Sequence, residues 1–154
     1  MLNGCSARPE TDSQVKLWLY SVEQKKNYEV TGGWYGSGQP CFSGDGKYLF
    51  FVSQRDFNPT YSQTEFNHAY QDMARVYLVT LAKETKSPFE PKSDEVGEKP
   101  SAAPAAGPVT VKVDTDGLKD RVLGLPIAPS NYSHLRSVGG TVYYLRHGSK
   151  DAAT

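Results

Sequence analysis

The stretch FSGDGKYLFFVSQRD, residues 42–56, decides how this chain folds. Five residues in it, Tyr48 to Val52, are apolar without a break. A strand with one face in water alternates apolar and polar residues, so both faces of this strand are expected to be covered by protein. The preceding pair Asp45 and Gly46 predicts a tight hairpin with a two-residue type I′ turn, which needs positive φ at both central positions.

The composition favours an all-β protein with a limited core. Hydrophobic residues make up 38% of the 154 residues, and the mean hydropathy is -0.56. Aromatic residues reach 12%, with ten tyrosines, and the apolar residues form short runs rather than helical stripes. Lys plus Arg and Asp plus Glu number 17 each, and no basic block occurs. Nothing in this balance favours a nucleic acid as partner.

The cysteines and the N-terminus show no disulfide framework, lipid anchor or membrane span. Cys5 and Cys41 lack metal-type spacing and are expected to be free thiols. LNGC at residues 2–5 looks like the end of a lipoprotein signal, but only Met1 precedes it, so the apolar stretch of such a signal is missing. No run approaches the roughly 18 apolar residues of a membrane span. A soluble chain is expected, and its compartment is left open.

Two internal repeats have different offsets. The stretch KLWLYSV, residues 16–22, matches RVYLVTL, residues 75–81, class by class at an offset of 59. The hairpin SGDGKYLFFV, residues 43–52, is echoed by SVGGTVYYLR, residues 137–146, at an offset of 94. A simple tandem repeat has one offset, so the difference of 35 (94 − 59) predicts extra chain between residue 81 and the second hairpin.

The extra chain is recognisable by its composition. Residues 86–108 are rich in Pro, Ala, Lys and Glu and contain one aromatic residue, so they bury too little apolar area to offset the entropy of ordering. A flexible insertion is predicted over residues 83–108. The loop 57–74 is also long, but its four Phe and Tyr residues predict that it is ordered against the protein.

Short strands then remain, and their spacing predicts a partial β-propeller of about two blades, each a four-stranded antiparallel meander. Strands are expected at residues 15–22, 28–31, 40–43, 47–53, 75–81, 109–113, 121–126, 132–137 and 141–147. Residues 16–31 would end one blade, 40–126 form a complete one, and 132–147 begin a third.

The expected divisions are an N-terminal extension 1–14, propeller strands 15–82, the insertion 83–108, further strands 109–148 and a tail 149–154. Stacking between adjacent blades explains the apolar strand 48–52. Because a propeller needs at least four blades, the chain is expected to be part of a larger protein in which Met1 need not be the natural start.

The succession of motifs resembles the propeller region of tricorn-like serine peptidases. It runs through LWLYSV, YEVTGG, FSGDGKYLFFVSQRD, RVYLVTL, TDGLKDRVLGLPIAPSNY and GGTVYYLR. The most specific element is DGLKDRVLGLP at residues 116–126, whereas the hairpin SGDGKY is shared by many propellers and has Gly44 where they usually place Pro.

This resemblance implies a supporting role. In the family, serine-based peptide hydrolysis belongs to domains C-terminal to the propellers, so no catalytic residue carries over. The segment would help to form a channel or vestibule that filters peptide substrates. Its partners would be those peptides, the remaining blades and the peptidase domains of a parent that forms a homo-oligomer in the cytoplasm or periplasm. Two alternatives stay open: a free-standing TolB-like propeller for protein binding, and the gating propeller of a prolyl-oligopeptidase-like hydrolase.

No catalytic, metal or cofactor site is predicted. Ser37 in GGWYGSGQP lacks the flanking glycines of a nucleophile elbow, and turn glycines between blades explain the stretch. His68, His134 and His147 have no metal-ligand spacing.

Two segments remain as candidate contacts. The long loop predicts a peptide-contacting rim made of Phe57, Tyr61, Phe66, His68 and Tyr70. The charged turn of Asp114, Asp116, Lys119, Asp120 and Arg121 could grip a peptide terminus, although a solvated turn with local ion pairs is the favoured interpretation.

Overall fold

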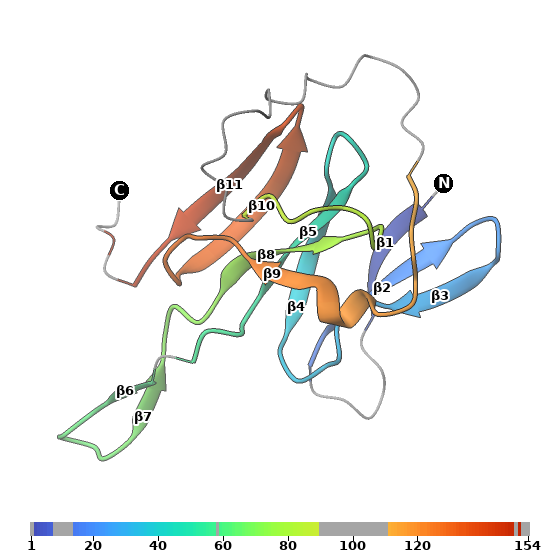
Figure 1. Ribbon diagram of the computed structural model, residues 1–154. Coiled ribbons are helices and arrows are strands. Elements are labelled where there is room, and N and C mark those ends of the chain that lie inside the picture. Colours follow the sequence, from blue (N-terminus) through green and yellow to red (C-terminus); the bar gives the residue numbers. More distant parts are fainter. Residues whose placement is uncertain (1, 8–13, 58, 90–110, 150, 152–154) are drawn as a thin grey trace.

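The computed structural model describes residues 2–7, 14–57, 59–89, 111–149 and 151, and its regular structure is almost entirely β (Figure 1). The elements in chain order are β1 (Leu2–Ala7), β2 (Lys16–Ser21), β3 (Lys26–Glu29), β4 (Ser37–Phe42), β5 (Tyr48–Ser53), β6 (Pro59–Tyr61), β7 (His68–Tyr70), β8 (Arg75–Thr80), the 3-10 helix η1 (Leu118–Arg121), β9 (Val122–Gly124), β10 (Asn131–Val138) and β11 (Thr141–His147). The strand pairs within the sheets are antiparallel. The all-β prediction is confirmed.

A four-stranded sheet in the order β4-β5-β8-β9 forms the centre of the molecule. It is the complete blade expected for residues 40–126, interrupted between β8 and β9. On one side lies the sheet β1-β2-β3, and on the other the hairpin β10-β11. The three sheets thus follow one another as successive blades of a propeller do.

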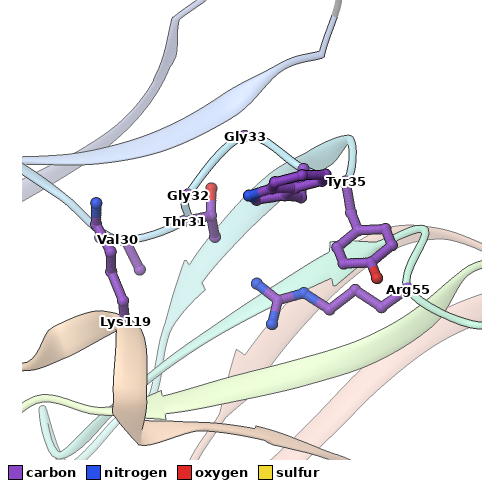
Figure 2. Close-up of a pocket in the computed structure, with 8 residues that line it drawn as sticks. Val30, Thr31, Gly32, Gly33, Tyr35, Arg55 and Lys119 are labelled. Carbon is purple, nitrogen blue, oxygen red and sulfur yellow. The ribbon is translucent and has the colours of Figure 1, made fainter.

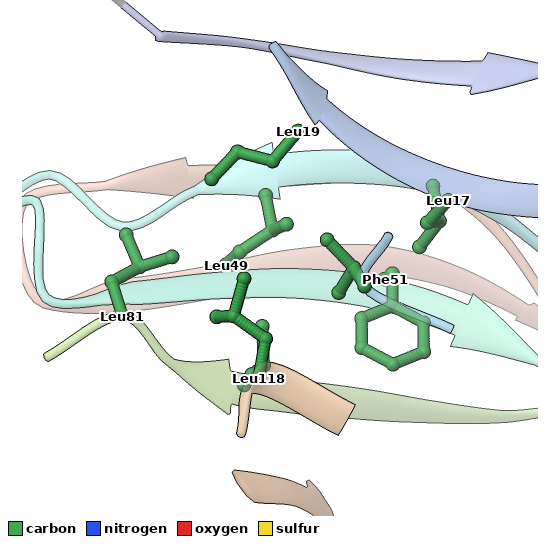
Figure 3. Close-up of a cluster of buried hydrophobic side chains, with 8 residues drawn as sticks. Leu17, Leu19, Leu49, Phe51, Leu81 and Leu118 are labelled. Atoms are coloured by element: carbon green, nitrogen blue, oxygen red, sulfur yellow. The ribbon is translucent and has the colours of Figure 1, made fainter. Parts of the chain in front are cut away.

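The two faces of β5 belong to two separate cores, which is why this strand is apolar throughout. Leu49 and Phe51 pack with Leu17 and Leu19 of β2 in the first cluster (Figure 3). Phe50 and Val52 point the other way. They join a second cluster that contains Tyr132 and Leu135 of β10. Because residues alternate across a strand, covering both faces of one strand requires a sheet on each side.

The repeated stretch occupies the same place in its two sheets. β2 lies between β1 and β3, and β8 lies between β5 and β9. In both strands the first four residues alternate between half-buried and buried, after which β8 is buried throughout and β2 is half-buried. The second repeat likewise corresponds to the hairpins β4-β5 and β10-β11.

Several strand boundaries differ from those expected. β1 lies in the expected N-terminal extension and pairs with β2 along its whole length. A strand was expected at residues 109–113, but Val111 and Val113 are not in a strand. They pack on the first cluster, and a single hydrogen bond, from the Asp114 N–H to the Leu81 oxygen, takes the place of strand pairing.

The expected strand 121–126 is shortened because η1 takes up its first residue and pairing with β8 ends at Gly124. β3 begins and ends two residues earlier than expected, and β4 begins three residues earlier, with an irregularity between Gly38 and Cys41. Most of the predicted insertion, residues 90–108, lies outside the described residues.

The turn between β4 and β5 is not the two-residue type I′ turn expected. Of the pair Asp45 and Gly46, only Gly46 has positive φ, at 70°. The Gly46 N–H donates to the Ser43 oxygen, and the Ser43 hydroxyl bonds the Asp45 carboxylate at 2.6 Å. The Ser43 hydroxyl also accepts from the Tyr48 N–H, so side-chain bonds close a longer turn.

Gly44 in this turn touches the equivalent turn of the next hairpin. A Cβ on Gly44 would lie 2.8 Å from the Gly139 carbonyl oxygen. A proline, usual at this place in such hairpins, carries that Cβ. The departure from the common pattern therefore has a steric cause.

Replacing Gly44 with alanine is expected to lower the free energy of unfolding by about 1–3 kcal/mol, because backbone must move to admit the methyl group. Urea denaturation measures the change. The matched control is Gly140→Ala, whose Cβ would meet no atom within 4 Å. Equal losses in the two variants would contradict the steric explanation.

Candidate functional site

The long loop after β5 forms a second, smaller hairpin that projects from the central sheet (Figure 1). β6 and β7 pair so that Tyr61 stands opposite His68. At the tip, the Ser62 N–H donates to the Asn67 oxygen and the Phe66 N–H to the Ser62 oxygen. The loop is therefore ordered by its own strand pairing.

The five candidate binding residues form one continuous line of rings along this hairpin. Phe57 contacts Tyr70 at 5.7 Å between ring centroids, Tyr70 contacts His68 at 6.4 Å, His68 contacts Tyr61 at 5.1 Å, and Tyr61 contacts Phe66 at 6.4 Å. The two Phe and two Tyr side chains are between 49% and 74% exposed. We call this set the aromatic face. The expectation that the loop packs on the protein is wrong for these rings, which contact one another.

The sequence contained a signal for this arrangement. Phe57, Pro59 and Tyr61 occupy every second position along the chain, and so do His68 and Tyr70. Residues two apart lie on the same side of a strand, so pairing the two segments places their rings on one side.

The base of the hairpin is held by a network around Asp56. Its carboxylate accepts from Arg75 Nη2 at 2.5 Å and from the Tyr77 hydroxyl at 3.0 Å, and its N–H donates to the Met73 oxygen. Burial, followed by the hydrogen bond to Asp56 and the Asp56 charge, raises the pKa of Tyr77 to about 12. Both strands that lead into the hairpin are thus fixed at their ends.

The hairpin emerges at the end of the sheets where the inter-sheet connections lie. The Gln54 N–H donates to the Gly36 oxygen in the connection from β3 to β4, and Ala74 forms a bridge with Ser130, which precedes β10. The turn at Gly44 lies beside that at Gly139 and belongs to the opposite end of these antiparallel strands. Both connections between the sheets therefore contact residues that flank the hairpin.

An open pocket that the sequence did not predict lies beside this base. The segment 30–35, Arg55 and Lys119 line it, and its volume is about 370 Å³ (Figure 2). No local motif marks it, because its walls come from three separate parts of the chain.

The ion pairs of the charged turn are not the expected local ones but join it to other parts of the chain. The Arg121 guanidinium donates to the carbonyl oxygens of Thr80, Leu81, Asp114 and Asp116. Asp116 pairs with Lys83 at 2.7 Å, and Lys119 pairs with Glu29. Asp114 accepts from the Lys83 N–H at 2.8 Å. The turn thus ties the end of β8 to the segment before β9.

Ser37 is built into a strand rather than exposed on an elbow. It lies in β4, is buried, and its hydroxyl is 2.8 Å from that of Ser53. The thiol of Cys41 is free and half-buried beside the second cluster, whereas the side chain of Cys5 lies outside the described part. No helix among the described residues is long and apolar enough to cross a membrane.

Comparison with known proteins agrees with this architecture. Residues 6–153 match the family described as "Tricorn protease second beta propeller domain". The chain is 38% identical over 143 residues to "Tricorn protease homolog 1" and 35% identical over 130 residues to "Putative tricorn protease homolog 2", both of Streptomyces coelicolor. These matches cover 90% and 77% of this chain, but only 13% and 10% of the relatives.

A solved structure shares the fold. "Crystal structure of the tricorn protease" superimposes with a TM-score of 0.64 at 17% identity, over 88% of this chain and 12% of that one. The family match extends over almost the whole chain, and its β-propeller description agrees with the three successive sheets. The chain therefore belongs to the family of tricorn protease second β-propeller domains.

Proposed function

We propose that this chain is a non-catalytic propeller segment of a tricorn-like serine peptidase, and that its blades help to form a channel or vestibule that filters peptides. Membership of the tricorn propeller family supports the assignment to such a peptidase. The chain spans about 13% of the length of its Streptomyces relative. The remaining blades and the peptidase domains are therefore proposed to come from the rest of the protein, whose assembly is proposed to be a homo-oligomer.

The incomplete outer sheets support neighbouring blades as partners. The central sheet has four strands, whereas β10 and β11 form a sheet of two among the described residues. Leu145 and Tyr143 on β11 are exposed. Further strands pairing with β11 would satisfy the backbone groups along its outer edge, and a further blade stacked on this sheet would cover these side chains.

The aromatic face is the observation that carries the peptide-contacting role. Its rings offer large apolar surfaces together with the Tyr hydroxyls, and exposed rings of this kind are enriched where proteins bind partners. Contacts to ring faces tolerate many side chains, which suits a passage for peptides of varied sequence. The hairpin projects from the sheet, so its rings are available without disturbing either core.

Replacing Tyr61 and Tyr70 together with serine is expected to weaken binding of a fluorescent mixed-sequence peptide roughly fivefold to a hundredfold, since each ring contributes about 0.5–1.5 kcal/mol. Fluorescence anisotropy measures the affinity. The free energy of unfolding should change little, because both rings are exposed.

The matched control is Tyr143→Ser, which removes an equally exposed tyrosine from β11. Binding should survive this change. If the double variant binds as the unchanged chain does, or if the control loses affinity to the same extent, the aromatic face is not the contact.

A further inference from the structure

The pocket at the base of the hairpin contains a cation whose charge the described residues leave unbalanced. In Figure 2 the Arg55 side chain extends beneath the Tyr35 ring, and its guanidinium ends between this ring and the Lys119 side chain, which also lines the pocket. The Arg55 Nε donates to the Ser53 hydroxyl at 3.2 Å. Within the described part of the chain, no carboxylate pairs with this guanidinium.

Aromatic rings hold the guanidinium in place. Its central carbon lies 5.2 Å from the ring centroid of Tyr77, 5.8 Å from that of Phe51 and 6.0 Å from that of Tyr35. Burial lowers the pKa of Arg55, while the neighbouring Tyr77 and Tyr35 act in the opposite direction. Rings around the guanidinium carbon restrict the group without accepting hydrogen bonds at their edges, so its terminal N–H donors stay available to a ligand.

The charged groups next to Arg55 in sequence and in the pocket wall have partners of their own. The carboxylate of Asp56, next in sequence, accepts from Arg75 and Tyr77. Lys119 is paired with Glu29, which also lies 3.7 Å from Lys16. Glu29 does not line the pocket. Arg55 is therefore the cation that offers free donors, and Lys119 adds a partly balanced charge at the opposite wall.

We propose that the Arg55 pocket is a carboxylate-binding site. A guanidinium and a carboxylate match in a planar, two-bond contact, which makes Arg the preferred partner of this group. Trp34 in the pocket wall is 89% exposed and Tyr35 is 47% exposed, so they offer ring surface to the apolar part of the same ligand. The volume of about 370 Å³ is at the lower end of ligand pockets, roughly 300–1,000 Å³, and suits one residue rather than a long segment.

The ligand is assigned as a peptide carboxylate, either the chain end or an acidic side chain, and this assignment rests on the proposed function. The pocket adjoins the base of the hairpin, since Arg55 is two residues before Phe57. A peptide lying on the aromatic face could thus place a carboxylate at Arg55. The chain end and an acidic side chain present the same carboxylate group, and peptides that carry only one of the two distinguish them.

Three peptides of one apolar sequence serve as probes: a free C-terminal acid, its C-terminal amide, and an amide with one internal Glu. Isothermal titration calorimetry on the 154-residue chain gives the affinities. The free acid should bind roughly tenfold to a hundredfold more tightly than the amide, as expected for losing charge-assisted hydrogen bonds. Recovery of affinity in the Glu-containing amide would assign the site to acidic side chains as well.

Variants test whether Arg55 is responsible. In Arg55→Gln the acid and the amide should bind alike, whereas Lys119→Gln should retain most of the preference for the acid. Near-ultraviolet circular dichroism checks that Arg55→Gln is folded. Trp34→Ala, at an exposed position, supplies a second variant that should weaken all three probes without removing the preference. Equal binding of acid and amide by the unchanged chain would overturn the proposal, as would an unaltered preference in folded Arg55→Gln.

N-acetylleucine and its amide separate this proposal from the peptide-filtering role. If no peptide binds but N-acetylleucine binds in an Arg55-dependent way, the carboxylate site stands and the peptide role fails. If peptides bind through the aromatic face with no acid preference, the peptide role stands and the carboxylate site fails.

Discussion

Replacing Phe51 with alanine is expected to lower the free energy of unfolding by about 3–5 kcal/mol, as for other fully buried Phe side chains. Phe51 is 0% exposed and packs in the first cluster with Leu17 and Leu19 of the preceding sheet and with Val30, which follows β3. It also stacks on Tyr77, with 5.9 Å between centroids, and lies beside Arg55. Its removal leaves a cavity at the contact between two blades, where neither sheet can close it alone.

The control is Phe66→Ala, which removes the same ring from a position that is 74% exposed. Urea denaturation should show a loss of less than about 0.5 kcal/mol for this surface change. Comparable losses in the two variants would mean that the contact between the first two sheets does not hold the fold together.

The apolar strand was predictable because its pattern depends on what covers it. Five consecutive apolar residues require two covered faces, and the structure places a different cluster on each. The repeats located the equivalent strands β2 and β8 for the same reason: similar neighbours select similar side chains. The residue pattern of a strand therefore indicates whether one or both of its faces are covered.

The strand β1 could not be recognised in the same way. Its sequence LNGCSA contains glycine and polar residues and lacks a run of β-branched or aromatic residues. It is placed by pairing with β2, which is a relation between segments rather than a property of either. The turn at Gly46 differs from expectation for a related reason, since the Ser43 hydroxyl competes for backbone N–H groups that the shorter turn would use differently.

One part of the candidate site could be predicted from the sequence and the other could not. The five aromatic residues could be predicted, because aromatic residues in a long polar loop stand out. The pocket around Arg55 could not, because Trp34, Arg55 and Lys119 come from three segments that only the stacking of two sheets brings together.

Replacing Asp56 with alanine is expected to lower the free energy of unfolding by about 2–3 kcal/mol, somewhat less than for a fully buried ion pair. The Asp56 and Arg75 side chains are 18% and 28% exposed, so the pair is partly screened. The change leaves Arg75 and the Tyr77 hydroxyl without their acceptor. Because Asp56 precedes Phe57, the base of the hairpin should loosen first, which hydrogen exchange of the Asp56 and Ala74 amides would detect.

The pKa of Tyr77 gives an independent readout of the same change. In the folded chain it is about 12, above the usual value of about 10, so the neutral phenol stabilises the fold below about pH 10 and this contribution is lost as the pH rises toward 12. Burial is the largest cause and persists in Asp56→Ala, whereas the hydrogen bond and the negative charge disappear. The Tyr77 pKa should therefore fall but stay above the usual value, as followed by tyrosinate absorbance against Tyr77→Phe. Asp56→Asn keeps an oxygen acceptor without the charge. In this variant the Tyr77 pKa should lie between its values in the unchanged chain and in Asp56→Ala. If Tyr77 titrates identically in all three chains, the network does not hold the base of the hairpin.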